Sequence, residues 1–181
     1  SASVLFTDFT GFTQVAGQMS PAELIAELDF YFSAFDRIME RHGLEKLKTI
    51  GDAYMAAAGV PTPSATHALD AARAAWEILQ LMQQVIADKQ RRGELHWNVR
   101  IGINTGPLMA GVIGRKKFAY DIWGNTVNIA SRLESTSQPG RINISASTYE
   151  QIKHCFRCQP RGKITAKNAG EIDMYFIEEL A

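Results

Sequence analysis

Two aspartates lie at turns of this chain where a carboxylate could hold a metal ion. The apolar run Val4–Thr7 predicts a buried strand that ends at Asp8, and the chain then turns through Thr10-Gly11 into a helix. Asp52 follows Gly51 at the tip of a predicted hairpin. Carboxylates suit Mg²⁺, and amides at a helix start suit phosphate. These residues indicate a metal and phosphate site. The loop is not a Walker loop, because no Gly-Lys-Ser/Thr follows.

The hairpin itself is the stretch Leu44–Met55, which predicts two short strands around a tight turn at Gly51-Asp52. It also carries Lys48, four residues before Asp52. One hairpin therefore offers a carboxylate and a cation that are too far apart along the strand for a simple ion pair. Taken alone, this stretch is more typical of a surface hairpin with a turn aspartate and a solvated lysine.

A third polar group follows a short strand that ends near Ile122 and a turn at Gly124. The helix predicted after this turn carries Asn128 and Arg132, which are four residues apart and share one face. An amide and a guanidinium on one face suit a ribose and a phosphate. A solvated polar face is the alternative, but the face follows directly on Asp121, which favours a binding role.

The remaining elements form the framework that must position these groups. Ser20-Pro21-Ala22-Glu23 is a strong helix start, and the helix continues to about His42 with an apolar stripe. A second long helix is predicted from about Ala65 to Arg91. Further strands are predicted at 97–104, 108–113, 141–144, 156–165 and 172–178, with a short helix at 146–154. This order predicts a single α+β domain over residues 1–181, with a mixed sheet covered by helices.

Composition excludes some classes of function. The chain has 19 Lys+Arg and 19 Asp+Glu in 181 residues, which argues against a nucleic-acid partner. No apolar run approaches membrane-spanning length and no signal peptide opens the chain, so we expect a cytoplasmic domain. The first residues are already strand-like, which predicts a domain excised from a longer protein. Membrane or sensor domains would then lie outside this stretch.

The two cysteines, Cys155 and Cys158, form a Cys-x-x-Cys pattern that occurs in redox sites and in half of a zinc site. No second cysteine pair or paired histidines completes a zinc site, and no helix of thioredoxin type follows. We therefore expect two reduced thiols in a strand region.

Three segments resemble the signature blocks of class III nucleotidyl cyclases. They are Phe6–Thr13, Lys48–Met55 and Tyr120–Arg132, and they are ordered and spaced as in that family. The resemblance covers the whole chain and is greatest to the mammalian membrane adenylyl cyclases and their mycobacterial relatives. It implies a ferredoxin-like βαββαβ core with additional strands and helices. It also implies a head-to-tail homodimer whose active sites lie between the subunits.

The resemblance further implies a role for each matching residue. Asp8 and Asp52 match the aspartates that hold two Mg²⁺ or Mn²⁺ ions per active site. Asn128 matches the residue that orients the ribose, and Arg132 the one that stabilises charge on the α-phosphate. The amides expected at the β- and γ-phosphates are those of Phe9, Thr10, Gly11 and Phe12.

Lys48 and Asp121 match the pair that recognises adenine. The chemistry agrees, because adenine presents a ring-nitrogen acceptor and an exocyclic amine donor. Guanylyl cyclases place Glu and Cys at these positions, so both residues favour ATP. Lys167 matches the phosphate-binding lysine, although the family pattern Val-Lys-Gly-Lys-Gly is replaced here by Ala-Lys-Asn-Ala-Gly at 166–170.

The sequence therefore predicts an adenylyl cyclase catalytic domain that makes cyclic AMP and pyrophosphate from ATP. Two alternatives remain open. One is a guanylyl or dual-specificity cyclase, and the other is an inactive cyclase-like module that dimerises or senses nucleotide.

Overall fold

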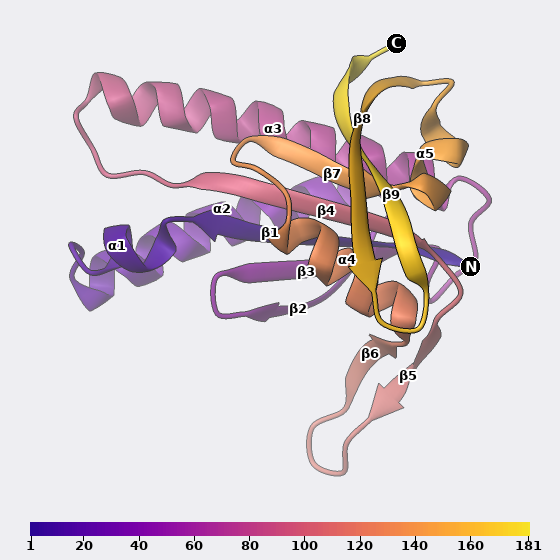
Figure 1. Ribbon diagram of the computed structural model, residues 1–181. Coiled ribbons are helices and arrows are strands. Elements are labelled where there is room, and N and C mark those ends of the chain that lie inside the picture. Colours follow the sequence, from indigo (N-terminus) through magenta and orange to yellow (C-terminus); the bar gives the residue numbers. More distant parts are fainter.

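The structure, a computed structural model that describes residues 1–181, is organised around a seven-stranded mixed sheet (Figure 1). Its strands, in the order β2-β3-β1-β4-β7-β9-β8, are β2 (Glu45–Ile50), β3 (Ala53–Ala58), β1 (Ala2–Thr10), β4 (Asn98–Gly106), β7 (Arg141–Ser145), β9 (Gly170–Leu180) and β8 (Phe156–Ala166). A separate hairpin consists of β5 (Met109–Ile113) and β6 (Ala119–Trp123). The helices are α1 (Phe12–Ala16), α2 (Pro21–His42), α3 (His67–Arg91), α4 (Asn125–Ser135) and α5 (Ala146–Ile152).

The first half of the chain forms the expected ferredoxin-like core. The elements β1, α2, β2, β3, α3 and β4 follow the order βαββαβ, and their strands lie side by side as β4-β1-β3-β2. All three strand pairs in this core are antiparallel. Strand β7 then pairs parallel to β4, and β9 and β8 extend the sheet. The α+β prediction with a mixed sheet is confirmed.

Helices α2 and α3 cover one face of this sheet. The hydroxyl of Ser20 accepts a hydrogen bond from the Glu23 amide, and the Glu23 carboxylate accepts one from the Ser20 amide, so α2 begins with the predicted capping box. The helix ends at Gly43, whose φ of 72° is the left-handed conformation that glycine adopts easily. The buried residues of its apolar face are Tyr31, Ala34, Phe35, Ile38 and Met39.

No helix of the chain has the length and apolar character needed to cross a membrane.

The side chains of β4 point alternately to the two faces of the sheet. Val99, Ile101 and Ile103 are fully buried in the main core, together with residues of α2 and α3. The other face of β4 lies against α4 and consists of Arg100, Gly102, Asn104 and Gly106. Helix α4 therefore covers the opposite face of the sheet from α2 and α3, as Figure 1 shows.

The start of the chain differs from the prediction in one respect that concerns the site. Strand β1 pairs with β4 as far as Thr10 opposite Asn98, because the ladder of backbone hydrogen bonds continues past Asp8. Asp8 therefore lies within a strand, and the prediction that the strand ends there is wrong. The helix that follows, α1, has only five residues and begins after Gly11, which has a φ of 70°.

The hairpin of β5 and β6 projects away from the main sheet (Figure 1). Its large exposed apolar side chains are those of Met109, Val112, Ile113 and Phe118. Side chains of this kind on a projecting hairpin favour burial against another surface.

The two cysteines lie at the start of β8. Cys155 and Cys158 are free thiols, as expected. Burial raises the pKa of Cys158 to about 11, so its thiolate is scarce at neutral pH.

Candidate functional site

Asp8 and Asp52 lie next to each other because β1 and β3 are paired. Thr7 lies opposite Tyr54 in this pair, so the turn before β3 places Asp52 beside Asp8. Burial and the neighbouring Asp8 carboxyl raise the pKa of Asp52 to about 6, and hydrogen bonds from the backbone of Asp52 and Phe9 offset part of this shift. The Oδ1 atom of Asp8 is buried and has no hydrogen-bond partner.

This pair of carboxylates fits a divalent cation that is bound together with a substrate. Nowhere in the chain do three or more His, Cys, Asp or Glu side chains form a group that could hold a metal ion alone. Mg²⁺ commonly keeps several waters and is held by one or two carboxylates plus substrate phosphates. The crowded carboxylates and the unpaired oxygen of Asp8 match that chemistry, and the binding of two ions here stays a prediction.

Two further charged residues lie beside Asp8. The Nη2 atom of Arg100 is 3.6 Å from Oδ2 of Asp8 and 3.8 Å from Oε2 of Glu134. Burial raises the pKa of Glu134, although Asp8 and Arg100 act in the opposite direction. Asp8, Asp52, Arg100 and Glu134 are called the carboxylate region below.

Arg100 and Glu134 are site residues that the sequence did not reveal. Arg100 is the only charged residue of β4, and a single charge in this strand is a sign of a functional residue that the sequence already contained. Its significance depends on the pairing of β1 with β4, which places Arg100 opposite Asp8. A cation at this place can stabilise phosphate oxygens that approach the carboxylates.

Lys48 and Asp121, which are distant in the sequence, form an ion pair. The Nζ atom of Lys48 donates to Oδ2 of Asp121 at 2.7 Å, and the amide of Ile122 donates to Oδ1 at 2.9 Å. Burial alone would raise the pKa of Asp121, but Lys48 and the Ile122 amide lower it below its ordinary value. Lys48 lies on the edge strand β2 and Asp121 on β6, so the pair joins the two hairpins.

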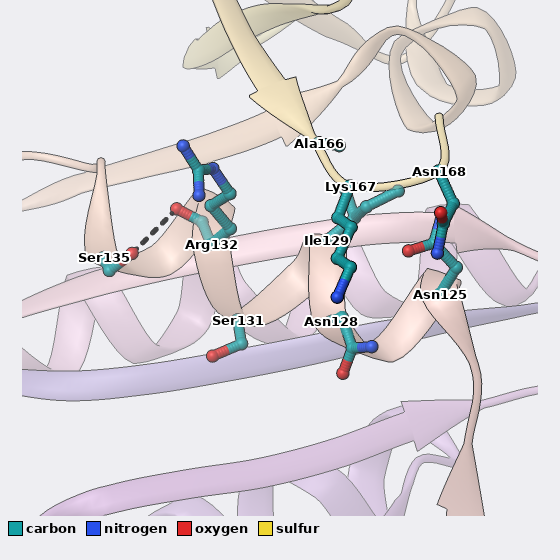
Figure 2. A pocket seen from close by; sticks show the side chains of 9 residues that line it. All are labelled: Asn125, Asn128, Ile129, Ser131, Arg132, Ser135, Ala166, Lys167 and Asn168. Atoms are coloured by element: carbon teal, nitrogen blue, oxygen red, sulfur yellow. Dashed lines mark hydrogen bonds between the residues drawn. The ribbon is translucent and has the colours of Figure 1, made fainter. Parts of the chain in front are cut away.

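Helix α4 and the loop between β8 and β9 form a polar pocket of about 380 Å³ (Figure 2). Its lining residues are Asn125, Asn128, Ile129, Ser131, Arg132, Ser135, Ala166, Lys167 and Asn168, and it is called the α4 pocket below. The structure thus brings together three predicted residues, Asn128, Arg132 and Lys167. In Figure 2 the side chain of Lys167 extends from its loop toward Asn128.

The loop that carries Lys167 makes a tight turn despite its departure from the family pattern. Ala166 pairs with Gly170, so only three residues connect the strands. Asn168 has a φ of 67° and Gly170 a φ of 68°, and Asn and Gly are the residues that adopt this conformation most readily. Asn168 therefore takes a backbone conformation that a glycine would otherwise supply, and Lys167 reaches the α4 pocket.

The carboxylate region and the α4 pocket lie on opposite sides of α4. Glu134 is buried toward β4 and Arg100, whereas Asn128 and Arg132 are exposed on the pocket side. A helix with its side chains is about 10 Å across, so side chains on opposite faces cannot hold the same phosphate. Within one chain, the side chains of Asp8 and Asp52 therefore do not reach the same phosphate as those of Asn128 and Arg132.

The amides predicted to bind the terminal phosphates are close to the carboxylates in sequence and in space. Phe9 and Thr10 are the last residues of β1, Gly11 precedes α1, and Phe12 begins it. The side chain of Phe9 is packed in the main core. Phosphate binding by these four backbone amides stays a prediction.

Comparison with known proteins identifies the family. Residues 1–179 match the adenylate and guanylate cyclase catalytic domain. An adenylate cyclase of Mycobacterium tuberculosis is 42% identical over 176 residues, which are 97% of this chain and 39% of that protein. The chain therefore belongs to the family of class III adenylyl and guanylyl cyclase catalytic domains, and it spans about two fifths of the length of this relative.

Solved structures show the same fold with both kinds of activity. The adenylyl cyclase CyaB from P. aeruginosa has a TM-score of 0.92 and 30% identity, over 98% of this chain and 93% of that one. The guanylate cyclase domain of RhGC from Catenaria anguillulae, in complex with GTP, has a TM-score of 0.90 and 35% identity, over 99% and 97%. Because adenylyl and guanylyl cyclases are both this similar, family membership does not determine which purine is used.

Proposed function

We propose that this domain is an adenylyl cyclase, which converts ATP to 3′,5′-cyclic AMP and pyrophosphate. The observation that carries the proposal is the ion pair of Lys48 and Asp121, 2.7 Å apart at the junction of two hairpins. Adenine offers a ring nitrogen to the ammonium group and an exocyclic amine to the carboxylate. Guanine has an exocyclic oxygen in place of that amine, so a carboxylate would face an acceptor and repel it.

In the proposed reaction the 3′-hydroxyl of ATP releases its proton to solvent and its oxygen attacks the α-phosphorus in line, while the bond to pyrophosphate breaks on the opposite side. Two Mg²⁺ or Mn²⁺ ions, held by Asp8 and Asp52, would supply Lewis-acid chemistry at the attacking oxygen and the triphosphate. Arg132 stabilises the negative charge that develops on the α-phosphate, and Asn128 orients the ribose.

The rest of the triphosphate requires several donors because it carries most of the substrate's charge. Lys167 in the α4 pocket and Arg100 beside Asp8 are the cations in position to contact it. The backbone amides of Phe9–Phe12 follow Asp8 directly in the chain and are proposed for the β- and γ-phosphates, for which the Phe9 amide would exchange its present hydrogen bond to Asp52.

We further propose that a second copy of this chain completes each active site. The carboxylate region and the α4 pocket lie on opposite sides of α4, so within one chain they do not face one phosphate, and a second subunit can bring its α4 pocket to the carboxylate region of the first. A head-to-tail two-fold dimer forms two such composite sites. In this dimer the partner subunit would also cover the exposed apolar residues of the β5–β6 hairpin. Because ATP is a cytoplasmic metabolite, we place the domain in the cytoplasm.

A guanylyl or dual-specificity cyclase is the second candidate, since the fold matches a GTP-bound guanylate cyclase domain at a TM-score of 0.90. Turnover of the purified domain with Mn²⁺ and either ATP or GTP distinguishes the candidates. We expect cyclic AMP from ATP and much less cyclic GMP from GTP. A preference for GTP would support the second candidate. Nucleotide binding without turnover would support an inactive nucleotide-sensing module.

A further inference from the structure

Two buried asparagines hold the backbone of α4, one near each end of the helix. Asn104 of β4 donates from Nδ2 to the carbonyl oxygen of Thr126 at 3.0 Å, in the first turn of α4. Asn143 of β7 donates from Nδ2 to the carbonyl oxygen of Leu133 at 2.9 Å, near the last turn. The exposed fractions of Asn104 and Asn143 are 4% and 0%. Buried amides are costly unless they are hydrogen-bonded, so both side chains have a definite orientation.

The surroundings of the two amides differ, but both direct a donor at a helix carbonyl. The Oδ1 atom of Asn104 lies 3.3 Å from the hydroxyl of Ser147, so both ends of this amide have a polar neighbour. The Oδ1 atom of Asn143 is buried and has no hydrogen-bond partner. The Nδ2 atom of Asn143 also lies 3.4 Å from Oγ1 of Thr136, just after α4, and 3.3 Å from Sδ of Met174. Its donor group, directed at the end of α4 and at Met174, therefore determines its orientation while its acceptor stays unpaired.

Close to both of these bonds, α4 lies unusually near to β4. A Cβ atom at Gly102 would be 2.2 Å from the amide nitrogen of Glu134, and one at Gly106 would be 2.7 Å from Oγ1 of Thr126. Gly102 and Gly106 flank Asn104 on the same face of the strand. The helix therefore packs directly on glycine backbone, and the two amide bonds oppose a shift of the helix along the sheet.

The position of α4 matters because Asn128 and Arg132 project from its exposed face into the α4 pocket. We propose that Asn104 and Asn143 are positioning residues, which determine where Asn128 and Arg132 meet the nucleotide by fixing both ends of α4. The proposal rests on the proposed cyclase function. A displacement of about 1 Å at a catalytic group can cost about 100-fold in rate, so loss of either bond is expected to reduce turnover.

The alternative is that the two amides stabilise the fold and nothing more. A purely structural role predicts a lower resistance to urea with an unchanged kcat for the folded protein. Ile103→Val provides the matched control, because Ile103 is buried in β4 next to Asn104 but faces the core on the other side of the sheet. This change lowers stability modestly without touching α4.

The experiment measures kcat and KM with ATP and Mn²⁺, together with urea unfolding, for Asn104→Ala, Asn143→Ala and Ile103→Val. We expect both asparagine variants to lose about 10-fold or more in kcat with KM changed by less than about 3-fold, because transition-state contacts are affected more than binding. Ile103→Val should keep the wild-type kcat despite its reduced urea midpoint. Asn104→Ala should also reduce kcat by a smaller factor in an Asn128→Ala background than in the wild type, because part of its effect on kcat passes through Asn128.

Equal kcat values for both asparagine variants and the wild type would overturn the inference. A loss of kcat in Ile103→Val as large as in the asparagine variants would overturn it as well. If Asn104→Ala does not fold, Asn143→Ala and the milder Asn104→Ser decide the result. A folded wild-type domain without turnover would reject the proposed function, and the inference with it. Normal wild-type turnover with unaffected asparagine variants would reject the inference alone.

Discussion

The carboxylate region and the α4 pocket differ in the sign and the burial of their charges. In the carboxylate region Asp8 and Glu134 lie beside Arg100 and Asp52 lies beside Asp8, and burial raises the pKa of both Asp52 and Glu134. The α4 pocket is open and contains Arg132 and Lys167 but no acidic side chain. The first region is therefore unfavourable without an added cation, and the second is suited to an anion. A metal–nucleotide complex carries both charges and matches both regions.

The difference also bears on the assembly. Each region lies on its own side of α4, so in the proposed dimer the same chain would supply the metal ligands of one site and the nucleotide contacts of the other. The proposed dimer makes the two regions parts of one site.

The largest effect is expected from loss of the carboxylates. Asp8→Ala and Asp52→Ala should each reduce cyclisation by on the order of 1,000-fold or more, because the metal ions would lose their protein ligands. Both changes should leave the fold intact, since the site is partly exposed. Asp173→Ala is a suitable control, because Asp173 forms an exposed surface pair with Lys163. Activity of Asp52→Ala close to that of the wild type, at matched Mn²⁺, would reject the metal assignment.

Subunit mixing tests whether the two regions come from different chains. Asp8→Ala and Arg132→Ala should each be nearly inactive as homodimers. In a mixed dimer both defects fall in one site and the other site is intact, so random mixing should restore up to about a quarter of wild-type sites. The activity is measured after the two variants have been incubated long enough to exchange subunits.

A second mixture provides the control for this experiment. Asp8→Ala with Asp52→Ala should restore nothing, because both residues are proposed to serve the same site from the same chain. Restoration in this control, or none in the first mixture, would show that the sites are not shared in the proposed way.

Exchange of the Lys48–Asp121 pair should have an intermediate effect. Lys48→Glu combined with Asp121→Cys should lower the preference for ATP over GTP by about 10- to 100-fold, because a mismatched buried polar contact costs about 1–3 kcal/mol. The measurement is the ratio of kcat/KM for the two nucleotides. Lys46→Glu is the control, because Lys46 lies on the same strand but pairs with Asp36. This variant should keep the wild-type ratio. A double variant with the wild-type preference would show that the pair does not recognise the base.

The elements of the fold could be predicted because their signals are local. The capping box of Ser20 and Glu23, the apolar stripe of α2 and the turn at Gly51 each depend on a few neighbouring residues. The end of β1 was predicted wrongly, because it depends on pairing with β4 as far as Asn98, which is a long-range interaction.

The predicted site residues could be named from the family's signature blocks, but their spatial relationships could not. Arg100 and Glu134 lie outside those roles and become visible only when the pairing of β1 with β4 and the packing of α4 are known. The separation of Asp8 from Arg132 by α4 likewise follows from which face of the helix is buried. Such relationships depend on tertiary packing rather than on spacing along the chain.

The smallest expected effect concerns the stability of the carboxylate region without metal. The pKa of Asp52 is raised from its ordinary 3.8 to about 6, so the folded state binds a proton between these values and the free energy of unfolding falls as the pH rises through this window. A shift of about two units corresponds to about 3 kcal/mol, which screening at this partly exposed turn reduces to about 1 kcal/mol or less. Asp52→Asn removes the charge, so it should match the wild type near about pH 4 and exceed it in stability near about pH 7. Urea unfolding in the presence of EDTA measures the difference, with Asp173→Asn as the exposed control. Parallel pH profiles for Asp52→Asn and the wild type would show that burial and the neighbouring Asp8 do not raise the pKa of Asp52, and the contrast between the two regions would lose its electrostatic basis.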